Sequence, residues 1–204
     1  MWTKKELLKW QNDEEFQLEQ VKKDGLNIQY IHNPTEKVCL EAVKKNGIYI
    51  QYIRNPTEEV CLKAVRKNGI CIQYIDNPTK EMCLEAIRQN EHSIQYIYNP
   101  TEEMCLEAVK QDGYCVKYIH NPTEEMCLKV VRENGHCIKH IHNPTEKMCL
   151  EAVKQNGHSI KHISNPSKEI CLEALNFINY DDIIRHIDIE KYPELYEKYY
   201  FMNT

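Results

Sequence analysis

The stretch from Asn99 to His120, NPTEEMCLEAVKQDGYCVKYIH, is the unit from which nearly all of the chain is built. Its opening dipeptide, Asn-Pro, recurs at a constant spacing of 22 residues, at positions 33, 55, 77, 99, 121, 143 and 165. A fixed period of this size is typical of a repeat array, in which each unit buries its apolar side against its neighbours. The sequence therefore predicts an array of about eight repeats rather than one globular domain.

Each repeat carries the start and stop signals of a helix. In Asn121–Glu124, an asparagine cap, a proline at the first helical position and a glutamate three residues after the cap match a capping box. At the other end, a glycine that could close the helix in the left-handed conformation recurs at one site. Glu91 replaces it in one copy, so we expect the turn after Asn90 to be strained or closed differently. The six glycines at this site are Gly25, Gly47, Gly69, Gly113, Gly135 and Gly157.

A short segment such as Ile50–Ile53 fills the rest of each repeat, and it permits two folds. A second helix of two turns would give a helical-hairpin solenoid, and a strand would give a horseshoe of alternating helices and strands. The motif of leucine-rich repeats is absent, and we favour the helix over the strand. The expected fold is thus an all-α solenoid of 22-residue two-helix repeats with a cap at each end.

The two ends of the chain depart from the repeat. We expect an N-terminal cap over residues 1–10, the solenoid over residues 11–187 and a C-terminal cap over residues 188–204. The first cap contains both tryptophans, Trp2 and Trp10. The second contains the aromatic residues Tyr192, Tyr196, Tyr199, Tyr200 and Phe201.

Composition limits the environment and the partners. The net charge of −5 provides no overall basic field for nucleic acid or acidic membranes, and no signal peptide or membrane span is readable. Seven of the ten cysteines occupy one site of the repeat, where we expect small buried apolar residues in a reducing compartment. They are Cys39, Cys61, Cys83, Cys105, Cys127, Cys149 and Cys171.

The recurring core CLEAVKxNG, followed by IxYI and NPTEE, resembles the EAVKxNG-type short helical repeat proteins of amoebal giant DNA viruses such as mimivirus, a repeat domain of unknown function. The resemblance covers about residues 11–187. It implies a helical repeat protein of giant-virus origin, acting inside the host cell, in its cytoplasm or in the virion. It brings no catalytic residues with it.

Positions that vary while the repeat stays constant are where an array would hold its binding specificity. These are the two residues after the glycine and the residue before Asn-Pro. The first residue after the glycine and the residue four later would share one helical face. In chain order the couples are Leu26 with Tyr30, Ile48 with Tyr52, Ile70 with Tyr74, His92 with Tyr96, Tyr114 with Tyr118, His136 with His140, and His158 with His162.

This surface predicts a groove that binds a peptide or protein, changing from aromatic to imidazole-rich along the array. Alternatively, the tyrosines only close the packing between repeats, with their hydroxyls in water. His136, His140, His158 and His162 raise zinc binding as a speculation, or a response to pH, but histidine could also be a polar substitute for tyrosine. We expect no cofactor and no metal.

A row of cations near the end of each first helix leaves single-stranded RNA as the alternative partner, with bases stacked on the tyrosines. These cations would equally pair with Glu41, Glu85, Glu107 and Glu151 three residues earlier and complement the helix dipole. No nucleophile or phosphate-loop motif is present. The expected function is a non-enzymatic scaffold for protein–protein interaction, with a viral or host protein as partner. The cations are Lys22, Lys44, Arg66, Arg88, Lys110, Arg132 and Lys154.

Overall fold

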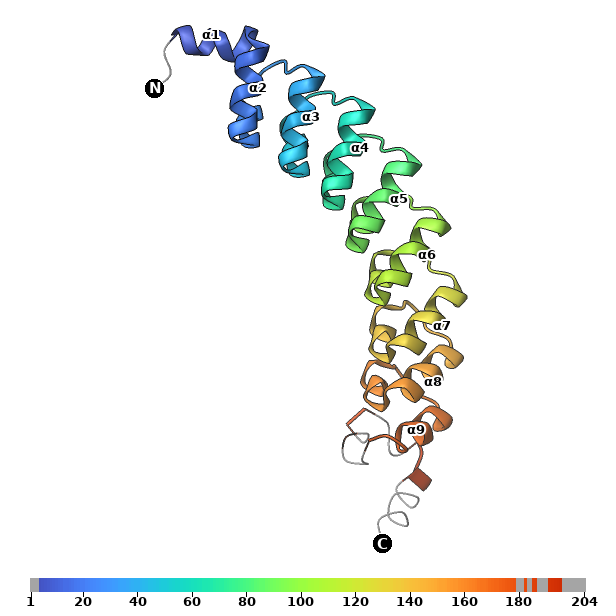
Figure 1. The fold of residues 1–204 in the computed structure, drawn as a ribbon. Helices are drawn as coiled ribbons and strands as arrows, with labels where there is room; N and C mark the ends of the chain where they lie inside the picture. The colour runs from blue at the N-terminus through green and yellow to red at the C-terminus, as the bar shows by residue number, and fades with distance from the viewer. Residues whose placement is uncertain (1–3, 179–181, 183–184, 187–190, 196–204) are drawn as a thin grey trace. The chain divides into compact units, whose positions relative to one another are not determined.

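The fold is an all-α solenoid, seen in a computed structural model that describes residues 4–178, 182, 185–186 and 191–195 (Figure 1). Over these residues no strand is present, and after two successive α-helices at the N-terminal end, α-helices alternate with six-residue 3-10 helices. The predicted helical repeat is therefore confirmed. The second segment of each repeat is a helix, as favoured, but of the 3-10 type.

The α-helices are α1 (Lys4–Asn12), α2 (Glu14–Lys23), α3 (Glu36–Lys45), α4 (Glu58–Lys67), α5 (Lys80–Gln89), α6 (Glu102–Gln111), α7 (Glu124–Glu133), α8 (Glu146–Gln155) and α9 (Lys168–Ala174). The 3-10 helices are η1 (Gly25–Tyr30), η2 (Gly47–Tyr52), η3 (Gly69–Tyr74), η4 (Glu91–Tyr96), η5 (Gly113–Tyr118), η6 (Gly135–His140) and η7 (Gly157–His162).

The chain divides into two compact units, Met1–Ala108 and Val109–Thr204. In the first unit, α2 to α5 contact one another in chain order, and so do η1 to η4. In the second unit, α7 to α9 and η5 to η7 do the same. Within each unit, every repeat therefore packs on the next one, as the repeat period predicts.

The core of each unit is built from the same sites of successive repeats. In α4, Val60, Cys61, Ala64 and Val65 are buried. In η3, the second helix of the same repeat, Ile72 is buried as well. All ten cysteines are buried and none forms a disulfide. The prediction that the repeated cysteines are small buried residues is confirmed, and burial of apolar area against the neighbouring repeat is the main stabilising contribution.

The α-helices begin two residues later than the capping-box prediction, which was wrong. Thr79 is the N-cap of α5, and its Oγ1 accepts a hydrogen bond from the amide of Met82 at 3.3 Å. Asn77 instead lies before the helix with a positive φ of 52°. Asparagine adopts the left-handed conformation more readily than most residues, so Asn-Pro forms the turn and threonine caps the helix.

The glycines do not close the helices in the left-handed conformation, because no glycine has a positive φ. The asparagine before the glycine has extended backbone and opens the 3-10 helix; Asn68 Oδ1 accepts the amide of Ile70 at 3.1 Å. Glycine is required by close approach, since a Cβ added to Gly69 would overlap the carbonyl oxygen of Ala86 in the next repeat.

The turn at Glu91 is not strained, contrary to expectation. Asn90 has the same extended backbone as its equivalents, and its Oδ1 accepts the amide of His92 at 3.0 Å. Because this site uses ordinary backbone angles, a side chain is conformationally allowed there.

The ends of the array are partly described. Trp10 is buried against the rings of Phe16 and Tyr30, with centroid distances of 5.3 and 5.8 Å. Near the other end, Leu195 is buried and Glu194 pairs with Lys168 at 2.7 Å. Tyr192 is half-buried, whereas Trp2 and the aromatic residues at 196, 199, 200 and 201 lie outside the described residues. The three domain boundaries stay predictions.

Candidate protein-binding surface

Four exposed tyrosines form a row on the first unit. Each is the last residue of a 3-10 helix in η1 to η4, and these helices contact one another in order (Figure 1). Between 38% and 50% of each residue is exposed. We call Tyr30, Tyr52, Tyr74 and Tyr96 the tyrosine row.

The predicted couples do not share a helical face within their own repeat. A 3-10 helix has three residues per turn, so residues four apart point about 120° away from each other. Accordingly, Ile48 is half-buried while Tyr52 is exposed. Leu26, Ile70 and His92 are half-buried in the same way.

In the second unit, the members of different couples meet across the junction between repeats. The ring of Tyr114 packs edge-on against His140 of the next repeat at 5.9 Å, and His136 packs on His162 at 5.8 Å. Each of these pairs joins a residue to the one that lies a full 22-residue repeat plus four positions later in the chain. Tyr118, His140 and His162, at the sites of the tyrosine row, are only half-buried rather than exposed.

Asparagines of the next repeat complete these junctions. Asn134 Nδ2 donates a hydrogen bond to the hydroxyl oxygen of Tyr114 at 3.2 Å, and Asn156 Nδ2 lies 3.2 Å from Nε2 of His136. These aromatic side chains thus contribute to packing between repeats, but the hydroxyl of Tyr114 is bonded to Asn134 and not left in water as the alternative to binding expected.

The junction histidines lie in a positive environment. Burial lowers the pKa of His136, and the charges of Lys161 and Lys139 lower it further. Burial followed by neighbouring lysine charges lowers the pKa of His140 and His162 as well. Among the described residues, His136, His140, His158 and His162 are not a group that brings three ligand atoms close enough to share an ion. His158 is exposed.

Two equivalent grooves lie beside the ends of the 3-10 helices. The groove of the first unit has a volume of about 290 Å³ and is lined by Gln11, Gln29, Tyr30, Ile31, His32, Tyr52 and Arg54. The groove of the second unit has a volume of about 780 Å³. Its lining includes Lys117, Tyr118, His120, Glu124, Cys127, His140 and His142. We call this second cavity the imidazole groove.

The predicted row of cations is partly occupied by ion pairs. Lys44 pairs with Glu41 at 3.7 Å and Arg88 with Glu85 at 3.9 Å, as predicted within one helix. Arg132 instead reaches Glu151 of the next repeat at 2.7 Å, and Arg66 reaches Glu81 at 3.6 Å. In each pair the side chain of the lysine or arginine is exposed to solvent, so the ion pair contributes little to the stability of the fold.

The other variable positions divide into two kinds. The second residue after the glycine is buried in η3 to η7, as in Cys71 and Ser159, and cannot meet a partner. The residue before Asn-Pro is exposed in every described repeat, and Tyr98 reaches 92% exposure. Both positions vary in sequence between repeats. The first is buried because it lies within the 3-10 helix, and the second is exposed because it follows that helix.

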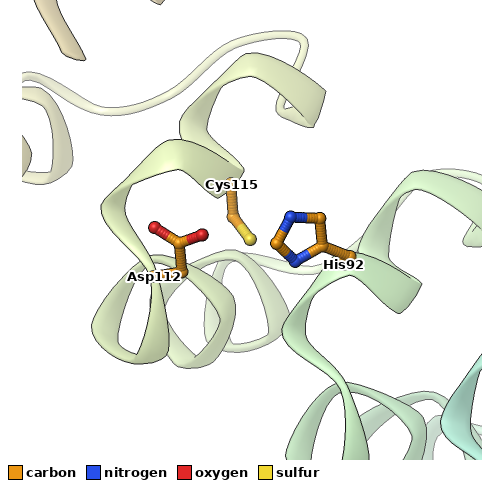
Figure 2. Close-up of side chains that lie close together, drawn as sticks. All are labelled: His92, Asp112 and Cys115. Atoms are coloured by element: carbon orange, nitrogen blue, oxygen red, sulfur yellow. The ribbon is translucent and has the colours of Figure 1, made fainter. Parts of the chain in front are cut away.

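Local contacts hold the side chains at the start of the 3-10 helices. Figure 2 shows His92 on η4. Its Nδ1 lies 3.1 Å from Oε1 of the preceding residue, Glu91. The figure also shows Asp112, which opens η5 by accepting the amide of Tyr114 at 2.9 Å, and Cys115 on the same helix. His92 and Asp112 therefore have roles in local structure, and Cys115 is buried.

Comparison with known proteins yields one family. A family model described as a domain of unknown function (DUF4116) matches residues 35–77, 57–100, 79–122 and 123–167, which is more than half of the chain. Each match spans about two of the 22-residue repeats. Searches of curated proteins and of solved structures return no significant match. None of the described helices has the length and apolar character needed to cross a membrane.

Proposed function

The chain belongs to the DUF4116 family of repeat domains, and from this premise we propose that it is a non-enzymatic scaffold that binds a protein partner through the tyrosine row. The carrying observation is that four successive 3-10 helices each expose one tyrosine at the same site. Stacked repeat arrays bind partners along surfaces that extend over several repeats, and tyrosine is enriched at protein interfaces, so this row supports the proposal.

Tyrosine suits this role because it buries a large area on binding and loses little conformational freedom. Two of the four glutamines beside the tyrosine row make hydrogen bonds within their own 3-10 helix. Gln73 Nε2 donates to the carbonyl oxygen of Ile70 at 3.2 Å, and Gln95 Nε2 donates to that of His92 at 3.0 Å. A surface that is ordered before binding loses less entropy when the partner arrives.

The spacing of the row favours an extended partner segment. Helices packed side by side are about 8–10 Å apart. A peptide in the polyproline II conformation has three residues per turn and advances about 3.1 Å per residue, so every third residue lies on the same side and would reach the next tyrosine. We therefore propose a partner segment in which every third residue is apolar or proline.

The resemblance to EAVKxNG-type repeats supports a more specific proposal on origin. We propose that the protein is encoded by a giant DNA virus and that its partner is a viral or host protein, met in the host cytoplasm or the virion. Single-stranded RNA is the competing partner, and the same experiment distinguishes it.

The test is capture from infected host cells on immobilised protein, with Tyr52, Tyr74 and Tyr96 all replaced by alanine in one variant. We expect this variant to lose the captured protein. A Phe177→Ala variant is the control, because it removes an exposed ring that lies outside both the row and the variable positions, and it should retain the protein. Circular dichroism checks that both variants fold.

Two results would contradict the proposal. The first is that the triple variant captures the same proteins as the unchanged chain. The second is that the captured material is RNA. RNA retention falls steeply with added salt because counterions are released on binding, whereas a contact made mainly by tyrosines does not.

A further inference from the structure

The imidazole groove differs from its equivalent in the first unit at the residues that carry charge. Lys117 replaces Gln29, His140 replaces Tyr52 and His142 replaces Arg54. The groove is also larger, at about 780 Å³ against about 290 Å³. The second unit therefore offers a site of different chemistry at the same place in the repeat.

We propose that the imidazole groove binds an acidic segment of the partner protein, with carboxylates held between Lys117 and the imidazoles of His120, His140 and His142, and that binding strengthens as the pH falls. This inference rests on the proposed function, because it assigns a second contact to the same protein partner. It uses residues outside the tyrosine row.

Two lysines are held near the groove by aromatic rings. Nζ of Lys117 lies 4.6 Å from the ring centroid of Tyr118, and Nζ of Lys139 lies 5.8 Å from that of Tyr114. Such contacts restrict where the ammonium groups lie. The pKa of His140 is lowered by burial and by the charges of Lys139 and Lys117, so this side chain experiences the positive field of both lysines. The same field attracts a carboxylate.

The balance of charge in the groove depends on pH. Its titratable lining is Lys117, Tyr118, His120, Glu124, Cys127, His140 and His142. Cys127 is buried, and burial raises the pKa of its thiol, so it contributes no charge near neutrality. With neutral imidazoles, Lys117 and Glu124 balance each other, and the histidines offer N–H donors. Each imidazole that takes up a proton adds one positive charge, and a carboxylate bound beside it favours that uptake. A carboxylate ligand therefore binds more strongly at lower pH.

A carboxylate ligand fits this lining better than a nucleic acid backbone. Single-stranded nucleic acid needs a continuous basic track, and only one permanent cation, Lys117, lines the groove. Glu124 would repel a chain that carries a charge on every nucleotide. A peptide can place one or two carboxylates beside Lys117 and keep neutral residues near Glu124.

The test is fluorescence anisotropy of the full chain with a short fluorescein-labelled peptide of alternating glutamate and serine, at pH about 7.5 and about 6. We expect tighter binding at the lower pH. Lys117→Gln should weaken binding about fivefold, the upper range for one exposed ion pair. Lys161→Gln, the same change two repeats later and outside the groove, should change binding less than about twofold. His140→Tyr combined with His142→Gln should reduce the dependence on pH.

Each other outcome overturns the inference. These are no binding of the peptide at either pH, equal losses in Lys117→Gln and Lys161→Gln, or displacement of the peptide by a short oligouridylate that binds more tightly. Circular dichroism establishes that the variants fold. If the groove fails while capture still depends on Tyr52, Tyr74 and Tyr96, the proposed function stands and only the acidic segment is wrong.

Discussion

The imidazole of His136 packs edge-on against the imidazole of His162 in the next repeat, with ring centroids 5.8 Å apart. Among the described residues, Nδ1 of His136 is buried without a hydrogen-bond partner. Nε2 accepts the hydrogen bond that Asn156 Nδ2 donates, so the neutral ring carries its hydrogen on Nδ1, and protonation would place a second hydrogen on Nε2 against that donor. This junction therefore favours the neutral imidazole.

The second unit should lose stability on mild acidification. The pKa values of His136, His140 and His162 are lowered in the folded chain, first by burial and then by nearby positive charges. The unfolded chain then binds more protons than the folded chain as the pH falls below about 6.5, and the free energy of unfolding decreases. Thermal unfolding followed by circular dichroism between pH about 7.5 and about 5.5 measures this loss.

A variant with tyrosine in place of all three histidines is the control for this prediction. Tyrosine already occupies the same sites at Tyr114, Tyr118 and Tyr74, so the change keeps an aromatic ring at each junction. Its unfolding temperature should depend less on pH over this range. An unchanged dependence would assign the acid sensitivity to other groups.

Replacing Gly69 by alanine should destabilise the first unit by about 1–3 kcal/mol, the usual cost of overpacking. The added Cβ would overlap the carbonyl oxygen of Ala86 and lie 3.0 Å from Oγ of Ser93. Backbone cannot move aside as a flexible side chain can. Urea unfolding measures the change.

Gly113→Ala is the matched control for that substitution. There the nearest atom to an added Cβ is Cγ1 of Val130, at 3.3 Å, and no carbonyl oxygen is among the nearest atoms. The cost should be clearly smaller than at Gly69. Equal costs would mean that loss of glycine itself, and not the approach of the next repeat, sets the penalty.

Asn77→Ala should cost about 1 kcal/mol, because alanine pays the steric penalty of the left-handed conformation. The φ of Asn77 is 52°. Asn77→Gly should be close to neutral at the same site, since glycine adopts this conformation freely. The pair is compared by thermal unfolding, and a glycine variant as unstable as the alanine variant would refute the role of backbone conformation.

The cysteines should react slowly in the folded chain. All ten are buried, and burial raises the pKa of Cys39, Cys71, Cys137 and Cys171 to about 11. The thiolate is the reactive form, so both access and thiolate population are low. Titration with Ellman's reagent at pH about 8 should show little reaction before unfolding and reaction of every thiol in urea. Rapid labelling of several thiols in the folded chain would contradict this.

The fold class followed from the sequence because repetition averages out local ambiguity. The helix boundaries could not be predicted from the sequence, because Asn77 and Thr79 are both residue types that cap helices. Only the backbone angle at Asn77 shows that Thr79 is the cap. The role of Gly69 was also missed, because the Ala86 carbonyl that demands glycine lies 17 residues away in the next repeat. Local sequence reports conformational freedom and does not report a distant close approach.

The candidate site could be predicted only in part for the same reason. The four members of the tyrosine row were recognised from their recurrence, and they are exposed, whereas Tyr118 at the same site is half-buried. The residues predicted to share a face with these tyrosines were assigned wrongly. Over only six residues, the apolar pattern expected for an α-helix is the same as that expected for a 3-10 helix. The contact of Tyr114 with His140 depends on the 3-10 geometry and on the neighbouring repeat together.

The approach of glycine to alanine has a consequence for how such a chain can change over generations. Gly47 meets the carbonyl of Ala64, Gly69 meets that of Ala86, and Gly135 meets that of Ala152. Because these three junctions are built alike, an in-frame duplication or loss of 22 codons between them would bring the same two surfaces together. The gene can therefore gain or lose whole repeats at these junctions, because the repeats that become neighbours have complementary surfaces.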